Sequence, residues 1–239
     1  MSDEPKSAQP ASSGTAGREA MLDRIRAGVS DDTPLQKRRD AVALRLGSSQ
    51  GPHLVPERAK QDAAGLKALF AQHLVGQTAT VLDVATAAEI PRTIAGYLRR
   101  HNLAPRLRMG SDERLQQLPW STEPTLTCEH GHARADDAVS LSHAVSAVAE
   151  TGTLVMASGA ANPVTLNYLP ETHIVVVRAA DIAGHYEAAF DRVRALLGRG
   201  TMPRTLNFIS GPSRTADIGG RLVVGAHGPR RLCVIVVGS

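Results

Sequence analysis

Two nearly continuous apolar runs constrain the fold of this chain more than any other feature of its sequence. HIVVVRA covers residues 173–179, and RLCVIVV covers residues 231–237. Both runs are short and rich in β-branched residues, and they lack the alternation expected of a strand with one solvated face. Strands of this kind are buried on both faces, so other elements must cover both sides of the sheet that contains them.

Shorter β-branched runs alternate with helical patterns along the rest of the chain. This order predicts an α/β fold with three layers, in which helices cover both faces of a mostly parallel sheet. The further predicted strands cover residues 79–84, 106–109, 125–129, 137–144, 152–158, 205–211 and 222–228. The predicted helices cover residues 18–29, 61–74, 86–101 and 185–197. Because the last two strands are joined by very few residues, an antiparallel pairing between them is the alternative.

Three segments have weaker patterns. Residues 30–60 are rich in Pro, Gly, Ser and charge and are expected to form an extended, loosely packed connection. VSAVAE, residues 145–150, is expected to be helical, and SRTADIGG, residues 213–220, is expected to begin a short helix. Thr86 and Glu89 have the spacing of a capping box at the start of the helix that follows them.

The ends of the chain set the expected domain organisation. Residues 1–16 are rich in Ser, Ala, Gly and Pro and are expected to be a disordered tail. Residues 17–239 are expected to form a single domain with an N-terminal helical extension. No stretch approaches the roughly 20 apolar residues of a membrane helix, and the N-terminus lacks the apolar core of a secretory signal. We therefore expect a cytoplasmic protein without membrane insertion.

Cysteine and histidine usage argues against bound metal. Cys128 and Cys233 are the only cysteines, so neither a disulfide framework nor a four-cysteine iron–sulfur cluster fits within the chain. Glu129, His130, His132 and Asp136 are close in sequence, but their spacing matches no metal motif, and a solvated loop is the expected structure. We expect no metal and no cofactor.

The charge of the chain is concentrated near its C-terminus. The net charge is +4, whereas residues 185–239 contain eight arginines and three acidic residues, a local net charge of +5. Aromatic residues make up 3% of the chain, which disfavours the stacking platforms that bind single-stranded nucleic acid. A small anion or an acidic partner would explain the arginines, and so would a solvated basic face. No nucleic-acid partner is expected.

Four sequence blocks occur in order in the second half of the chain: AETGT at 149–153, LPETHIVVV at 169–177, SGPSRTADI at 210–218 and GAHGPRR at 225–231. Together they resemble the LUD domain of C-type lactate-utilization proteins. The resemblance is strong over residues 135–239 and weak toward residue 18. It implies a fold of the ribose-phosphate isomerase, glucosamine-phosphate deaminase and CoA-transferase type. It also implies an accessory role in oxidising L-lactate to pyruvate, with iron–sulfur partner subunits that carry the electrons.

The third block suggests an anion site. If Ser213 caps a helix that begins there, free backbone N–H groups and the helix dipole favour a carboxylate or phosphate. Arg214 would add a planar fork of donors, and Gly211 would let the ligand approach the backbone. The alternative from the residues alone is that Ser213 only caps the helix and Arg214 pairs with Asp217.

The first and fourth blocks supply further candidates for the same small anionic ligand. Thr151, Gly152 and Thr153 offer hydroxyl and backbone donors around a glycine, and His227 lies between glycines in a turn. We expect these residues to meet Ser213 and Arg214 at the carboxyl ends of neighbouring strands. The catalytic candidates are Glu150, Asp217 and His227. The alternative function is a stand-alone enzyme or regulatory module that binds a phosphorylated or nucleotide-like small molecule.

Overall fold

The computed structural model describes residues 13–29, 33–47, 54–198, 200–216 and 219–238, and the chain separates into two compact units, residues 1–51 and 52–239. The first unit contains the helices α1 (Ser13–Val29) and α2 (Leu35–Gly47). The expected tail of residues 1–16 therefore overlaps α1, and residues 1–12 lie outside the described residues. The expectation of an extended connection over 30–60 is wrong for α2, because Leu, Ala, Arg and Lys are strong helix formers whatever their charge.

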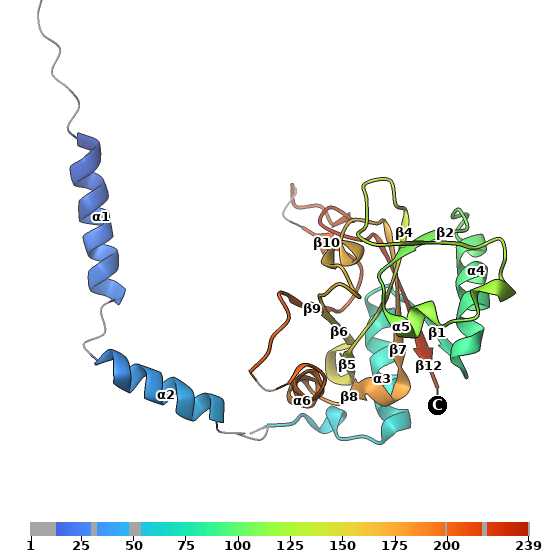
Figure 1. Ribbon diagram of the computed structural model, residues 1–239, viewed down its shortest axis with the longest axis horizontal. Helices are drawn as coiled ribbons and strands as arrows, with labels where there is room; N and C mark the ends of the chain where they lie inside the picture. The colour runs from blue at the N-terminus through green and yellow to red at the C-terminus, as the bar shows by residue number, and fades with distance from the viewer. Residues whose placement is uncertain (1–12, 30–32, 48–53, 199, 217–218, 239) are drawn as a thin grey trace, which may run out of the picture. The chain divides into compact units, whose positions relative to one another are not determined.

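The second unit is built on a six-stranded sheet with the strand order β1-β12-β7-β4-β2-β3 (Figure 1). Every neighbouring pair in this sheet is parallel. Its strands are β1 (Thr80–Val84), β2 (Arg106–Met109), β3 (Thr127–His130), β4 (Val139–His143), β7 (Thr172–Arg178) and β12 (Arg231–Val237). The prediction of an α/β fold with a mostly parallel sheet is confirmed, and β12 lies between β1 and β7 rather than in an antiparallel pair with residues 222–228.

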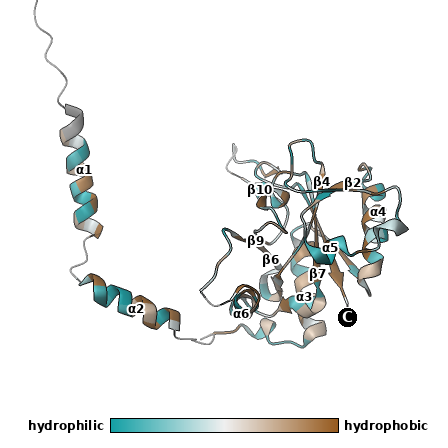
Figure 2. Ribbon diagram, viewed as in Figure 1, coloured by the Kyte–Doolittle hydropathy of each residue, from teal (hydrophilic) through white to brown (hydrophobic). Residues whose placement is uncertain are grey.

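Apolar residues of the central strands pack against different elements on the two sides of this sheet, and the strands are hydrophobic along most of their length (Figure 2). Cys233 and Ile235 belong to one core, together with Ile94 of helix α4 (Ile90–Arg100). Val234 belongs to a second core, together with Phe70 of helix α3 (Ala63–Gly76). This alternation along β12 is the reason for its continuous apolar sequence. The capping box of Thr86 and Glu89 is present, at the start of the turn that leads into α4.

A smaller sheet with the strand order β8-β5-β6-β9 forms the other part of the second unit. Its strands are β5 (Ser146–Val148), β6 (Thr153–Ala157), β8 (Ile182–Ala183) and β9 (Leu206–Ile209), and α6 (Tyr186–Leu197) packs against it. The expected helix over 145–150 is wrong: β5 is followed by a 3-10 turn, η4 (Ala149–Thr151). A short buried apolar segment has the same pattern in a helix and a strand, and pairing with β6 decides between them.

The segment before the last strand also differs from expectation. Arg214 and Thr215 form β10, which pairs antiparallel with β11 (Val223–Val224), so no helix begins at Ser213. The connection between β10 and β11 contains Gly219 and Gly220, both with positive φ, which suits a turn better than a helix. The remaining short elements are α5 (Glu113–Gln116), η1 (Glu57–Ala59), η2 (Ala87–Glu89), η3 (Trp120–Thr122), η5 (Val164–Asn167) and η6 (Ala179–Asp181). Over the described residues, no helix is both long and apolar enough to cross a membrane.

Candidate functional site

Four hydroxyl groups from the first and third sequence blocks and from α6 form one hydrogen-bonded cluster. Thr153 Oγ1 lies 2.7 Å from Thr151 Oγ1, 2.7 Å from Ser210 Oγ and 3.2 Å from the Tyr186 hydroxyl. Thr153 begins β6, and Ser210 follows the end of β9. These residues meet because β6 and β9 are antiparallel, so the start of one strand lies beside the end of the other. The expectation was a meeting at the carboxyl ends of two neighbouring strands. Because Thr153 is fully buried, this hydroxyl cluster joins the two loops from the inside.

The two glycines of these loops pack against the C-terminal end of α3. A Cβ atom on Gly152, which has φ 64°, would lie 2.6 Å from the Cβ of His73. A Cβ on Gly211 would lie 2.9 Å from the Cβ of Gln77. Both positions therefore need glycine for the close approach of two backbones. This packing explains why both positions are glycine, and the explanation needs no bound ligand.

Arg214 contacts the same helix end. Its Nη2 donates to the carbonyl oxygen of Gln77 at 3.1 Å and to the hydroxyl of Thr78. The last carbonyls of a helix have no partner within the helix, and the helix dipole favours a cation beside them. Arg214 therefore satisfies the end of α3. Asp217, its alternative partner and a catalytic candidate, lies outside the described residues.

Ser213 connects the third block to the fourth. Its backbone N–H donates to Pro229 O at 2.8 Å, and its carbonyl accepts from the N–H of Gly225 at 2.9 Å. Its side-chain oxygen accepts from the backbone N–H of His227 at 3.3 Å. With no helix to cap, the Ser213 hydroxyl holds the turn that contains His227, and the two predicted site residues lie side by side.

His227 lines a cavity of about 420 Å³ that is formed by Tyr168, Leu169, Glu171, residues 224–228 and Arg230. Glu171 immediately precedes β7 and Arg230 immediately precedes β12, so this cavity, which we call the motif pocket, lies at the amino edge of the central sheet. The expectation of a site at the carboxyl ends is wrong for this pocket. Tyr168, Glu171 and Arg230 were not among the predicted site residues, although Glu171 and Arg230 belong to the second and fourth blocks.

Glu150, a catalytic candidate, immediately precedes Thr151 of the hydroxyl cluster. Its Oε2 atom is buried and has no hydrogen-bond partner among the described residues, and the same holds for Nε2 of His73. The backbone N–H of Glu150 donates to Gly184 O at 3.1 Å.

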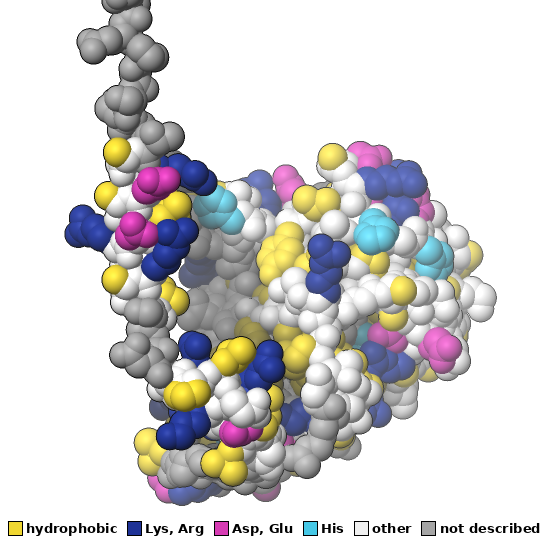
Figure 3. Space-filling view, turned by 60° about the vertical axis from the view of Figure 1, so that its left-hand side comes forward, with side chains coloured by type: hydrophobic (Ala, Val, Ile, Leu, Met, Phe, Trp, Pro, Cys, Tyr) yellow, Lys and Arg dark blue, Asp and Glu magenta, His cyan; other side chains and the backbone are white. Residues whose placement is uncertain are grey.

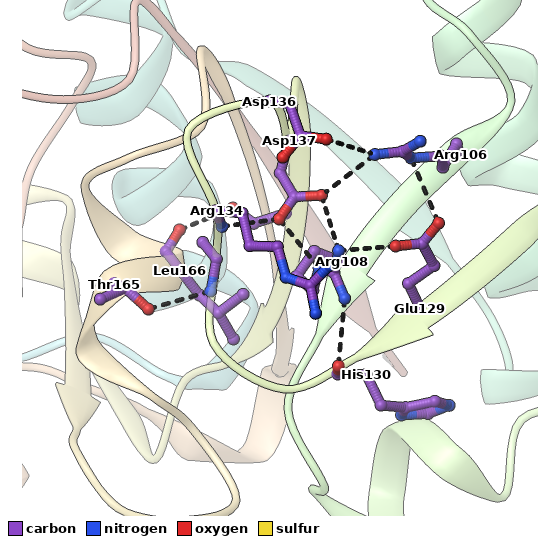
Figure 4. A network of polar contacts seen from close by, with 11 residues as sticks. Arg106, Arg108, Glu129, His130, Arg134, Asp136, Asp137, Thr165 and Leu166 are labelled. Carbon is purple, nitrogen blue, oxygen red and sulfur yellow. Dashed lines mark hydrogen bonds and ion pairs between the residues drawn. The ribbon is translucent and has the colours of Figure 1, made fainter.

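The loop that contains His130 and His132 is organised by ion pairs (Figure 4). Arg108 of β2 donates to both carboxylate oxygens of Asp137, at 2.8 and 3.1 Å, and its Nη2 lies 2.6 Å from a Glu129 oxygen. Burial raises the pKa of Asp137, but hydrogen bonds from Arg108 and from the Arg134 backbone outweigh it and hold this pKa below its ordinary value. Among the described residues, no group of three His, Cys, Asp or Glu is placed to hold a metal ion.

Basic side chains do not form one continuous band on the face seen in Figure 3. Among the side chains coloured there, lysines and arginines are separated by hydrophobic and uncharged surface.

Comparisons with known proteins agree with these blocks. The LUD domain family matches residues 68–237. Lactate utilization protein C of Deinococcus radiodurans is 32% identical over 221 residues, which cover 91% of this chain and 94% of that protein. Lactate utilization protein C of Shouchella clausii is 39% identical over 90 residues, and this match spans only 39% of the length of that relative.

A solved structure has the same fold. The crystal structure of a DUF162 family protein from Deinococcus radiodurans superposes with a TM-score of 0.56 and 26% sequence identity. The superposition covers 74% of this chain and 99% of that chain. With the match of the family over most of the second unit, these findings show that the chain belongs to the LUD domain family, among the relatives named lactate utilization protein C.

Proposed function

We propose that this chain is an accessory subunit of an iron–sulfur-dependent system that oxidises L-lactate to pyruvate, and that its motif pocket binds a small anion. The observation that carries the first part is the similarity to lactate utilization protein C along 91% of the chain. The chain has two cysteines, too few for a four-cysteine cluster. Electron transfer through such a cluster would therefore need a partner protein.

The anion site rests on the chemistry of the motif pocket. Arg230 supplies a planar cation suited to a carboxylate or phosphate, and His227 supplies a ring that can donate a hydrogen bond. Gly225 has φ 85°, and a Cβ there would lie 2.8 Å from the Cβ of Arg230, so glycine at this position lets Arg230 pack against the turn. Glu171 also lines the pocket, and its carboxylate lies 3.7 Å from Nη1 of Arg231, which offsets part of its negative charge. The hydroxyl cluster is a less favourable anion site, because it lies beside the negative end of the α3 dipole.

Growth on L-lactate tests the role in lactate oxidation. We expect deletion of the gene to abolish growth with L-lactate as the carbon source, and growth on pyruvate to be unaffected. Re-expression of the wild-type chain should restore growth. Normal growth of the deletion strain on L-lactate, with no second homologue in the genome, would contradict the proposal.

Purification of the native complex tests the partner. The chain is expected to co-purify with at least one protein that contains an iron–sulfur cluster, identified by its visible absorbance and by mass spectrometry. This complex should reduce an electron acceptor when L-lactate is added. A chain that purifies alone and converts a phosphorylated substrate would instead support the enzyme alternative.

Titration with inorganic phosphate tests the motif pocket. Arg230→Gln is expected to weaken phosphate binding about tenfold or more, because a charge-assisted hydrogen bond contributes about 1.5–3 kcal/mol. Arg204→Gln, which removes an exposed arginine that precedes β9, is the matched control and should leave binding unchanged. Equal effects of the two substitutions would argue against a site at Arg230.

A further inference from the structure

The connections of the central sheet diverge between β2 and β4. The chain continues from β2 outward to β3, whereas it continues from β4 in the opposite direction to β7. The first connection packs on the side of α4, through Leu115 and Trp120, and the second contributes Leu154 and Met156 to the side of α3. Open α/β sheets bind ligands outside the carboxyl ends of the strands at such a divergence. The motif pocket lies at the amino edge, so this position is not part of it.

Charged and titratable side chains follow three neighbouring strands at this edge. Asp112 and Arg114 follow β2, with Arg114 Nε 2.9 Å from Asp112 Oδ1 and Nη2 2.5 Å from Oδ2. His143 ends β4. Asp181 follows β7 and pairs with Arg178 at 2.6 Å and with Arg192 at 2.9 Å.

The hydrogen bond of His143 determines which ring nitrogen is available. Its Nδ1 lies 2.7 Å from the carbonyl oxygen of Ala144, and because a carbonyl can only accept, Nδ1 must carry the hydrogen. Burial, together with the charge of Arg114, lowers the pKa of His143 to about 4, so the ring is neutral near pH 7. In this tautomer Nε2 is an acceptor, and the described residues offer it no hydrogen-bond donor. A ligand hydroxyl group would be a suitable donor.

A second acceptor without a hydrogen-bond partner in the described part of the chain, Oδ1 of Asn162, belongs to the loop that packs against Gly110 at this edge. The carbonyl oxygen of Ala161 is so close to Gly110, the residue after β2, that a Cβ on Gly110 would lie 1.9 Å from it. Ser111 Oγ donates to Ala160 O at 3.3 Å in the same contact. The next residue of the loop, Asn162, is 6% exposed, and its Oδ1 has no partner among the described residues. Buried polar atoms are normally hydrogen-bonded, so Asn162 Oδ1 can accept a hydrogen bond from water or from a ligand.

We propose that the carboxyl edge between β2 and β4 is a second binding site, and that it takes a small 2-hydroxycarboxylate. Arg114, which keeps Nη1 outside its pair with Asp112 and has a side chain 45% exposed, binds the carboxylate from the solvent side. His143 Nε2 accepts the hydrogen of the 2-hydroxyl group. The choice of L-lactate as the first ligand to test rests on the proposed function, whereas the position of the site does not.

Binding of L-lactate to the purified full chain, followed by calorimetry or ligand-observed NMR, tests this site. Arg114→Gln is expected to weaken binding about ten- to a hundredfold, the range for a lost charge-assisted hydrogen bond. Arg92→Gln, on the exposed side of α4, removes the same charge elsewhere and should leave binding unchanged. Propanoate, which lacks the hydroxyl group, should bind the wild-type chain more weakly than L-lactate, and His143→Gln should remove this difference.

Two results would overturn the proposal: no binding of L-lactate to folded wild-type chain at tens of millimolar, or binding that Arg230→Gln abolishes and Arg114→Gln leaves intact. The second result would place lactate in the motif pocket. If His143→Gln fails to fold, the ¹⁵N chemical shifts of the His143 ring in the wild-type chain replace it as the test. The proposal requires these shifts to change when L-lactate is added and to stay unchanged when propanoate is added. None of these binding measurements depends on growth on L-lactate. Failure of this site and failure of the proposed role in lactate oxidation can therefore be told apart.

Discussion

At the scale of single residues, the side chain that looked most like a ligand-binding group has a structural contact instead. Arg214 donates to Gln77 O and to the Thr78 hydroxyl at the end of α3. We expect Arg214→Ala to destabilise the fold by about 1 kcal/mol, a value reduced by the exposure of this side chain. Chemical denaturation measures this change.

Arg214→Lys is the matched variant for that prediction. A lysine keeps the charge beside the helix end but cannot reproduce two contacts from one planar group, so it should recover part of the stability. Phosphate binding should be unaffected by either substitution. Loss of phosphate binding without loss of stability would instead show that Arg214 belongs to an anion site.

His173 gives a residue-scale prediction about pH. It is 1% exposed, and burial lowers its pKa to about 3, while an unfolded histidine has a pKa near 6.5. Between these values only the unfolded state gains the proton, so stability is lost as pH falls below about 6.5. Replacing His173 with Gln should reduce the stability difference between pH 7 and pH 4.5 by about 2–3 kcal/mol. An unchanged difference in urea denaturation would show that His173 does not stay neutral.

At the scale of elements, close backbone contacts and one buried ion pair hold the loops in place. Gly152 has φ 64° and no room for a Cβ beside His73, whereas a Cβ on Gly159 would meet nothing within 4 Å. We expect Gly152→Ala to destabilise the protein by more than about 2 kcal/mol, because strain and overpacking add. Gly159→Ala should change stability by less than about 1 kcal/mol. Similar melting temperatures for the two variants would contradict the packing role of Gly152.

The ion pair between β2 and the loop after β3 gives a second prediction at this scale. The side chains of Arg108 and Asp137 are 4% and 3% exposed, and removal of Asp137 leaves the buried Arg108 with the part-exposed Glu129 as its remaining ion-pair partner. Asp137→Ala should therefore cost about 3–5 kcal/mol. Asp136→Ala, at a carboxylate that is 73% exposed, should cost less than about 1 kcal/mol. Thermal unfolding of the two variants compares a buried and an exposed carboxylate in the same network.

At the scale of the whole molecule, the described hydrophobic cores contain residues of the second unit alone. All three clusters lie between Leu66 and Val237, and the described part of α2 has no buried residue. We expect deletion of residues 1–51 to leave the melting temperature of the remaining chain unchanged within about 2–4 °C, the shift that about 1 kcal/mol produces in a domain of this size. A larger decrease would mean that the first unit packs on the second.

The sequence by itself determined the features that depend on local chemistry and on periodicity. Continuous β-branched runs identified β7 and β12, the Thr86 and Glu89 pair identified a helix start, and the four blocks identified the family. Tertiary structure decided the rest. Ser146–Val148 and Arg214–Thr215, both within segments expected to be helical, are strands because a neighbouring strand pairs with each, and local propensity is weaker than such pairing. Likewise, only the folded chain places Arg214 at the end of α3 and Glu171 beside His227, because these relations join segments that are distant in sequence.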